Sequence, residues 1–256
     1  MRDTLPPRRR GAPWRRRQAL LLPPALLLGP AAAQAGRIAA QADPIAAQAE
    51  NIAAQAGDVD LLLVLAVDAS GSIDADEFRL QREGCAGALV HPAVLAAVAS
   101  RPLGAIGVAL VEWGAPGGAA TVVGWHRVGD AASAERLARA VVDAPRSPQS
   151  WNAIGDAVDH AAGLIAAAPW RAAQRVIDVS GDGPDMRGLR PVEAARRDAA
   201  AQGITINALA IEDSRPGLGA TYEATVIAGD GAFVMTAQSR ADFARALRAK
   251  LVREIA

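Results

Sequence analysis

A continuously apolar run from Leu61 to Val67 is the clearest pattern in the chain. Polar and apolar positions do not alternate in it, so it predicts a strand covered on both faces in a parallel sheet, and we expect it to be the central strand. Helical spacing follows from Asp74 to about Val90, and Asp74 with Glu77 three residues later has the form of a capping box. Together they predict the first strand–helix unit of an α/β domain.

Strand and helix patterns then alternate to the end of the chain. We expect strands at 106–113, 121–125, 175–180, 204–211 and 232–236, and helices at 132–142, 153–167, 191–202 and 240–255. The turn at 114–118 is too short for a parallel crossover, so the strands that it joins are predicted to be antiparallel. The predicted fold class is α/β: a doubly wound, mostly parallel, Rossmann-like sheet with one antiparallel edge strand and helices on both faces.

Residues 1–35 have the order of a secretory signal peptide. Seven arginines stand against one aspartate in residues 1–17, and a short apolar run follows from Ala19 to Leu28. That run is too short to span about 30 Å of hydrocarbon, so we expect no transmembrane helix in the mature form. The pair Arg16-Arg17 leaves twin-arginine export open beside the general secretory route.

Residues 36–57 continue a seven-residue repeat whose units contain Ala-Gln-Ala. Each unit has at most one large apolar residue, and Pro44 interrupts a helix, so we predict a linker and not a coiled coil. Signal peptidase accepts such small residues, which leaves several cleavage positions open: Ala35, Ala42, Ala49 and Ala56. Residues 58–256 are then predicted to form one domain.

Composition excludes several classes of function. The chain has 27 basic and 27 acidic side chains, but residues 1–57 carry 8 of the basic and 3 of the acidic ones, so the body is mildly acidic. An acidic surface does not neutralise phosphates, and we expect no nucleic-acid partner. The single cysteine, Cys85, excludes an intrachain disulfide and is expected on the buried face of a helix. The three histidines lack the spacing of a zinc site.

Two loops at the carboxyl ends of predicted strands carry the candidate chemistry. Asp68, Ser70 and Ser72 alternate directly after the first strand, and Asp182 follows the strand at 175–180. If these two strands are neighbours in the sheet, the side chains meet at the edge where ligands bind in doubly wound folds. Short oxygen-bearing side chains on a tight loop suit a hard cation such as Mg²⁺. The sequence therefore predicts a divalent-metal site at this edge.

Other polar and aromatic residues near these loops are given structural interpretations. Asp185 is expected to be a turn residue, and Asp156 and Asp159, on a predicted helix, are expected to face solvent. Trp113 and Trp125 close neighbouring strands and are expected to pack in the core or at its rim.

The candidate site resembles that of a known family. Asp68-x-Ser70-x-Ser72 after an apolar strand, with Asp182 after a later strand, is similar to the metal-ion-dependent adhesion site (MIDAS) of von Willebrand factor type A (VWA) domains. The resemblance covers residues 58–256. Further runs resemble an exported bacterial branch of unknown function, DUF1194: Val111–Trp113, Ala153–Asp156, Asp178–Pro184, Gly231–Val234 and Lys250–Ala256.

The resemblance implies roles for the site residues. Ser70 and Ser72 would coordinate the metal directly, whereas Asp68 and Asp182 would act through bound water. Where the family has a threonine before the middle helix, this chain has Asn152, with Ser150 as an alternative oxygen donor nearby. The implied ion is Mg²⁺, with Mn²⁺ or Ca²⁺ as alternatives.

The predicted function is a non-enzymatic protein-binding module, periplasmic or secreted, whose metal binds an acidic side chain of a partner protein. A divalent ion held by neutral hydroxyls keeps positive charge, and the helix N-terminus after Asp74 also favours an anion. The sequence leaves the oligomeric state open.

Two other functions are weighed. One is a metal-assisted phosphoesterase or hydrolase that uses Asp68 or Ser70, and the other is a metal-free binder of small anions. No histidine adjoins either loop and no Gly-x-Ser-x-Gly motif is present, which disfavours an enzyme.

Overall fold

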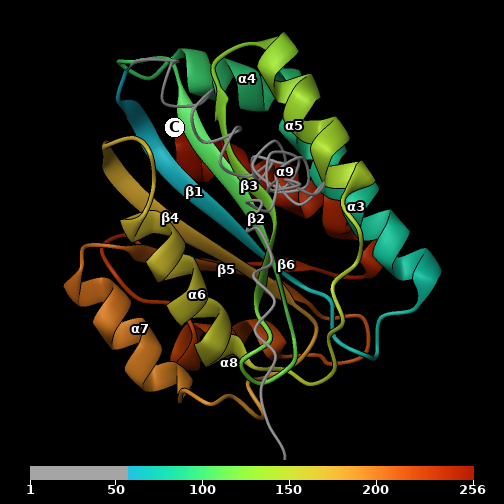
Figure 1. The fold of residues 1–256 in the computed structure, drawn as a ribbon. Helices are drawn as coiled ribbons and strands as arrows, with labels where there is room; N and C mark the ends of the chain where they lie inside the picture. Colours follow the sequence, from blue (N-terminus) through green and yellow to red (C-terminus); the bar gives the residue numbers. More distant parts are fainter. Residues whose placement is uncertain (1–56) are drawn as a thin grey trace, which may run out of the picture. The chain divides into compact units, whose positions relative to one another are not determined.

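The computed structural model describes residues 57–256, so the predicted signal peptide and nearly all of the predicted linker lie outside the described residues. The strands of this part form one sheet in the order β3-β2-β1-β4-β5-β6 (Figure 1). Neighbouring strands are parallel except β2 and β3, which are antiparallel. The predicted fold class, the inner position of the first strand and the antiparallel edge strand are confirmed. The bounds of the strands are Val59–Asp68 (β1), Ile106–Trp113 (β2), Ala120–Val128 (β3), Ala172–Gly181 (β4), Thr205–Ile211 (β5) and Val234–Ala237 (β6).

Helices cover both faces of the sheet (Figure 1). One face carries α3 (Ala75–Leu89), α4 (Pro92–Ala99), α5 (Ala131–Asp143) and α9 (Phe243–Ile255). The other face carries α6 (Ile154–Ala166), α7 (Val192–Ala201) and α8 (Leu218–Thr225). Within residues 57–256, no helix combines the length and the apolar character that crossing a membrane requires.

The apolar run of β1 has side chains in both cores. Leu61, Leu63 and Leu65 pack in the core under α3, α5 and α9, whereas Leu62 and Val64 pack in the core under α6. Successive side chains of a strand point to opposite faces, so a strand covered on both sides needs apolar residues at every position. Cys85 on α3 is fully buried, as predicted, and burial raises the pKa of its thiol to about 12.

Two helices were absent from the sequence prediction. α4 has eight residues and begins three positions after α3 ends, with the His91 imidazole accepting a hydrogen bond from the Ala93 N–H at 3.1 Å. α8 also has eight residues and follows Gly217, whose φ of 86° lies in the left-handed region. Segments this short contain too few apolar repeats to define a helical period. The last predicted helix begins with a separate 3₁₀ turn, η1 (Arg240–Asp242).

The interpretation of Asp156 as a solvated residue is wrong. Its carboxylate is buried and accepts hydrogen bonds from the N–H groups of Gly117 at 2.7 Å, Leu189 at 2.9 Å and Arg190 at 2.8 Å. Two loops from other parts of the chain fold over the start of α6, which helical periodicity does not reveal. Asp159, one turn later, is exposed and lies 3.3 Å from the Arg190 guanidinium.

Close approach of the same loop to α6 gives a testable prediction. A Cβ atom at Gly155 would lie 2.1 Å from the Arg190 carbonyl oxygen, whereas one at Gly163 on the same helix would meet nothing within 4 Å. We expect Gly155→Ala to lower the free energy of unfolding by about 2 kcal/mol, because backbone must move to make room. Gly163→Ala should raise it by up to about 1 kcal/mol, since alanine favours the helix. Urea denaturation followed by circular dichroism measures both, and equal effects would contradict the packing of this loop.

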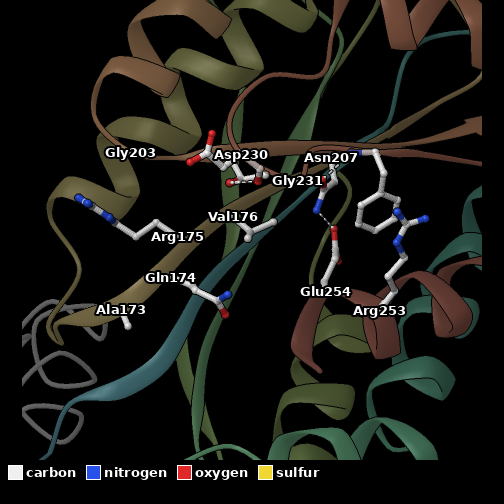
Figure 2. Close-up of a pocket in the computed structure, with 12 residues that line it drawn as sticks. Ala173, Gln174, Arg175, Val176, Gly203, Asn207, Asp230, Gly231, Arg253 and Glu254 are labelled. Carbon is white, nitrogen blue, oxygen red and sulfur yellow. Dashed lines mark hydrogen bonds between the residues drawn. The ribbon is translucent and has the colours of Figure 1, made fainter.

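Buried charged groups hold α9 on the sheet. The Lys250 ammonium lies 2.7 Å from Asp178 Oδ1 on β4 and also contacts the Glu254 carboxylate. The Asn207 amide on β5 donates to Glu254 Oε1 at 2.8 Å (Figure 2). Figure 2 also shows that this contact lies beside a cavity of about 460 Å³ near the Arg253 guanidinium, which stacks on Phe233. The only lysine of the chain is thus a buried partner of two acids.

Candidate metal centre

The first loop of the site leaves the end of β1. Asp68 is the last residue of that strand and is 1% exposed, and its Oδ1 accepts a hydrogen bond from the Ser70 N–H at 2.8 Å. The hydroxyl oxygens of Ser70 and Ser72 lie 3.2 Å apart. Ser70 is buried and Ser72 is exposed, so this pair of hydroxyls runs from the sheet edge toward solvent. The alternate spacing does bring the two serine oxygens together, as the sequence indicated.

The second loop lies directly beside the first. β1 and β4 are parallel neighbours with Val67 opposite Ser180, so Asp68 and Asp182 leave the sheet side by side. Burial raises the pKa of Asp68 to about 7, the Ser70 N–H opposes this rise, and the negative charge of Asp182 adds to it. The two carboxylates therefore lie close enough for their charges to interact.

One oxygen of Asp68 has no partner. Oδ2 is buried, and no described residue donates a hydrogen bond of normal geometry to it, although the nearby Asp182 N–H lowers the pKa of the carboxyl group. An unpaired buried carboxylate oxygen is costly, because burial removes the water that would otherwise solvate it. A bound cation, directly or through water, is one way to satisfy it.

A third loop, residues 147–153, adjoins the loops that follow β1 and β4. The Asn152 side chain is buried against the Asp182 loop: a Cβ at Gly183 would lie 2.3 Å from Asn152 Nδ2. The Gly71 N–H donates to the Ser150 carbonyl at 2.8 Å, which ties this loop to the first one. Asn152 therefore lies at the meeting point of the three loops, whereas the side chain of Ser150 is exposed.

A buried acid fixes the third loop. One Glu112 oxygen at the end of β2 accepts from both the N–H and the hydroxyl of Ser147 at 2.6 Å, and the other lies 2.5 Å from the Arg82 guanidinium. Arg82 also donates to the Val141 carbonyl at 2.8 Å. The Glu112 carboxylate thus connects β2, α3 and the third loop.

Asp185 contacts a distant helix and is not the local turn residue that the sequence suggested. Its Oδ1 accepts hydrogen bonds from the N–H groups of Ile154 at 2.8 Å and Gly155 at 3.4 Å, so it caps α6 from a distant loop. Burial raises the pKa of Asp185, and the two N–H groups oppose the rise. Trp113 and Trp125 are buried in the core, as expected.

Three residues that sequence reasoning missed support the site. The Arg146 guanidinium donates to the carbonyls of Ala69, Ser70 and Ile73, all in the first loop. The hydroxyl of Tyr222, a buried residue on α8, donates to the Gly183 carbonyl at 2.7 Å.

The third missed residue is Arg240. It lies three positions after β6 ends and forms ion pairs with Asp182 and Glu77. Strand β6 is parallel to β5, so its carboxyl end lies at the same edge as the site. The loops after β1 and β4 were identified because they follow the carboxyl ends of parallel strands, and the same rule identifies the loop after β6.

The donor set fits a hard divalent cation. Two hydroxyls and two carboxylates lie on adjoining loops, and Asp68 supplies a buried oxygen without a hydrogen bond of normal geometry. In the part of the chain that the structure describes, no three histidine, cysteine, aspartate or glutamate side chains form a group able to hold a metal. A metal here would thus depend on the serine hydroxyls and on water.

Similar solved structures identify the fold. Proximal thread matrix protein 1 from the mussel byssus has a TM-score of 0.58 and 15% identity, over 76% of this chain and 48% of that one. The von Willebrand factor type A protein from Catenulispora acidiphila has a TM-score of 0.54 and 18% identity, over 77% and 43%. Pilus adhesin SpaC from Lactobacillus rhamnosus GG has a TM-score of 0.56 and 15% identity, over 78% and 31%. The described part of the chain therefore has the fold of a VWA domain.

The family follows from the sequence comparison. The family described as "Protein of unknown function (DUF1194)" matches residues 58–256, and the chain belongs to this family. Comparison with curated proteins gives no significant match. This chain spans about half or less of the length of the mussel, Catenulispora and Lactobacillus structures.

Proposed function

We propose that the chain is an exported, non-enzymatic binding module that holds Mg²⁺ at the edge of its sheet and uses it to bind an acidic group of a partner protein. The proposed metal site consists of Asp68, Ser70, Ser72, Asn152 and Asp182. The observation that carries this proposal is the unpartnered, buried Oδ2 of Asp68, which adjoins a second carboxylate and two hydroxyls.

The proposed ligands include neutral and negatively charged oxygen donors. The two serines offer neutral oxygens, and Asp68 and Asp182 supply the negative charge that attracts a cation. When bound, a divalent ion would supply a partly uncompensated positive charge that a carboxylate from another molecule can neutralise. The α3 N-terminus, capped by Asp74, adds partial positive charge on the same side.

Structural neighbours support this assignment. One structure of the mussel protein has a zinc-occupied MIDAS motif, and SpaC is a pilus adhesin. Both are built on the same fold as this chain. The neighbour's zinc does not identify the ion, and we favour Mg²⁺ because the donors here are oxygens.

The surface around the site indicates what the partner presents. Trp151, Met186 and Leu189 are large apolar side chains with 45%, 54% and 79% of their surface exposed, and they belong to loops that flank Asn152 and Asp182. The Arg187 guanidinium stacks on the Trp151 ring at 4.4 Å from its centroid. A partner segment with an acidic residue next to apolar ones would complement this surface.

The location that we propose is the periplasm or the cell exterior. It rests on the basic, then apolar, order of residues 1–35. Pilus and matrix proteins among the structural neighbours support a place in or outside the cell envelope.

Calorimetric titration with Mg²⁺ tests the metal site. We compare the full chain with Asp68→Asn, which keeps an acceptor for the Ser70 N–H but removes the charge. We expect affinity to fall by about 100-fold in Asp68→Asn, and not to change in Asp143→Asn, whose carboxylate is exposed at the end of α5. No heat from the wild-type chain with Mg²⁺ or Mn²⁺ would overturn the proposal.

Two further measurements separate the other functions. Mg²⁺-dependent hydrolysis of p-nitrophenyl phosphate that disappears in Asp68→Asn would establish a phosphoesterase. Binding of inorganic phosphate in the presence of EDTA would establish a metal-free anion binder. We expect neither.

A further inference from the structure

The Arg240 guanidinium bridges two acids at the proposed metal site. Its Nη2 lies 2.5 Å from Asp182 Oδ2, and its Nε lies 2.8 Å from Glu77 Oε1. The Arg240 side chain is 13% exposed and that of Asp182 is 16% exposed, so water screens this contact poorly. One positive charge is therefore fixed on a carboxylate that the proposed function assigns to the metal.

Several contacts fix the arginine in this position. The second oxygen of Glu77 accepts a hydrogen bond from the Asp74 N–H at 3.0 Å as part of the capping box of α3. On the other side, Arg240 opens the 3₁₀ turn η1, where Ser239 caps the Asp242 N–H. The guanidinium thus connects the metal loop, the start of α3 and the segment before α9.

The charges around Asp182 explain why the arginine is there. Asp68 and Asp182 are two acids close enough for their charges to interact at a largely buried edge, which is unfavourable without a cation. Arg240 supplies a cation that belongs to the protein itself. A divalent ion would supply the same compensation from outside.

We propose that Arg240 sets the metal affinity of this site: its charge stabilises the metal-free form by holding Asp182, and it opposes the entry of a divalent cation. This inference rests on the proposed function, because it concerns the same site. The consequence is that the site releases its metal more readily than its oxygen ligands alone would allow.

Removing the Arg240 charge should raise the affinity for Mg²⁺, whereas structural damage should lower it. We expect the full-length Arg240→Gln variant to bind Mg²⁺ about tenfold more tightly than wild type, because repulsion between the guanidinium and the ion is lost. The matched control is Arg136→Gln, an exposed arginine on α5 that makes the same change in net charge. Loosening of the loop alone would weaken binding, so the sign of the change separates the two effects.

A second variant tests the same charge from the other side. Glu77→Gln removes one of the acids that compensate Arg240 and keeps a side chain suited to the capping box. We expect it to weaken Mg²⁺ binding about threefold, whereas Glu83→Gln, exposed on the same helix, should leave binding unchanged. This variant decides the matter if Arg240→Gln does not fold.

The outcomes distinguish the two proposals. If wild type binds Mg²⁺ and folded Arg240→Gln binds it equally or more weakly, the proposed role of Arg240 is overturned and the metal site stands. Equal or tighter Mg²⁺ binding by Glu77→Gln has the same meaning. Mg²⁺ binding by Arg240→Gln but not by wild type overturns the proposed function of the native chain, whereas the effect of the Arg240 charge stands. Absence of binding in every variant overturns the proposed function.

Discussion

Replacing Lys250 with methionine is expected to lower the free energy of unfolding by about 4 kcal/mol. The ammonium is fully buried and compensates Asp178, itself 1% exposed, and Glu254. Methionine fills similar space but leaves the buried Asp178 carboxyl group without its cation, and removing one partner of a buried ion pair is strongly destabilising. The corresponding fall in the midpoint of thermal denaturation is about 10 °C.

Arg248→Met on the same helix is the matched control. It removes the same charge from a half-buried residue and should change the free energy of unfolding by less than about 0.5 kcal/mol. Urea denaturation of the full chain measures both variants. Adding Asp178→Leu to Lys250→Met should restore part of the loss, because one of the two buried acids that lost their cation is then removed. Equal effects of the two single variants would show that Lys250 is not the buried counter-charge.

Stability is expected to fall as the pH rises from about 4.5 to 7, with Glu254 responsible for roughly 3 kcal/mol of the change. Burial raises the pKa of Glu254 from 4.5 to about 7, the charge of Asp178 adds to the rise, and Lys250 opposes it. A carboxyl group with a higher pKa in the folded chain binds its proton more tightly there. Its contribution to stability is therefore full below the unfolded pKa and is lost as the pH rises through the folded pKa.

Glu254→Gln tests this dependence, because glutamine still accepts a hydrogen bond from Asn207 and never ionises. The slope of stability against pH should become shallower between pH 4.5 and 7, and the variant should be more stable than wild type above pH 7. Part of the slope remains, since burial also raises the pKa of Asp68 to about 7. Glu223→Gln, exposed on α8, is the control and should keep the wild-type slope. An unchanged slope in Glu254→Gln would contradict the burial of a protonated acid beside Lys250.

The strands and the long helices could be predicted because their patterns are local. The continuous apolar run of β1 indicates a strand that is covered on both faces. Asp74 and Glu77 indicate the start of α3, because a capping box forms between residues three positions apart. Helices α4 and α8 left no such signal, since each has eight residues and α8 has no side-chain cap.

The centre of the candidate site followed from topology. Asp68 and Asp182 meet because parallel strands end at one edge, and the sequence indicated both strands. Asp156, Tyr222 and Arg146 differ, because each binds backbone groups of a loop distant in sequence. Only the folded chain shows which loop passes over which side chain, so their roles could not be predicted.

The burial of Cys85 has a practical consequence. Its thiol is fully enclosed under α3 with a pKa of about 12, and thiolate is the form that reacts with maleimide reagents. The folded native protein should therefore stay unlabelled, and a cysteine introduced at an exposed position such as Leu189 would carry a fluorophore alone. The chain is thus a ready background for following, by a single reporter beside the sheet edge, the arrival of whatever molecule it captures.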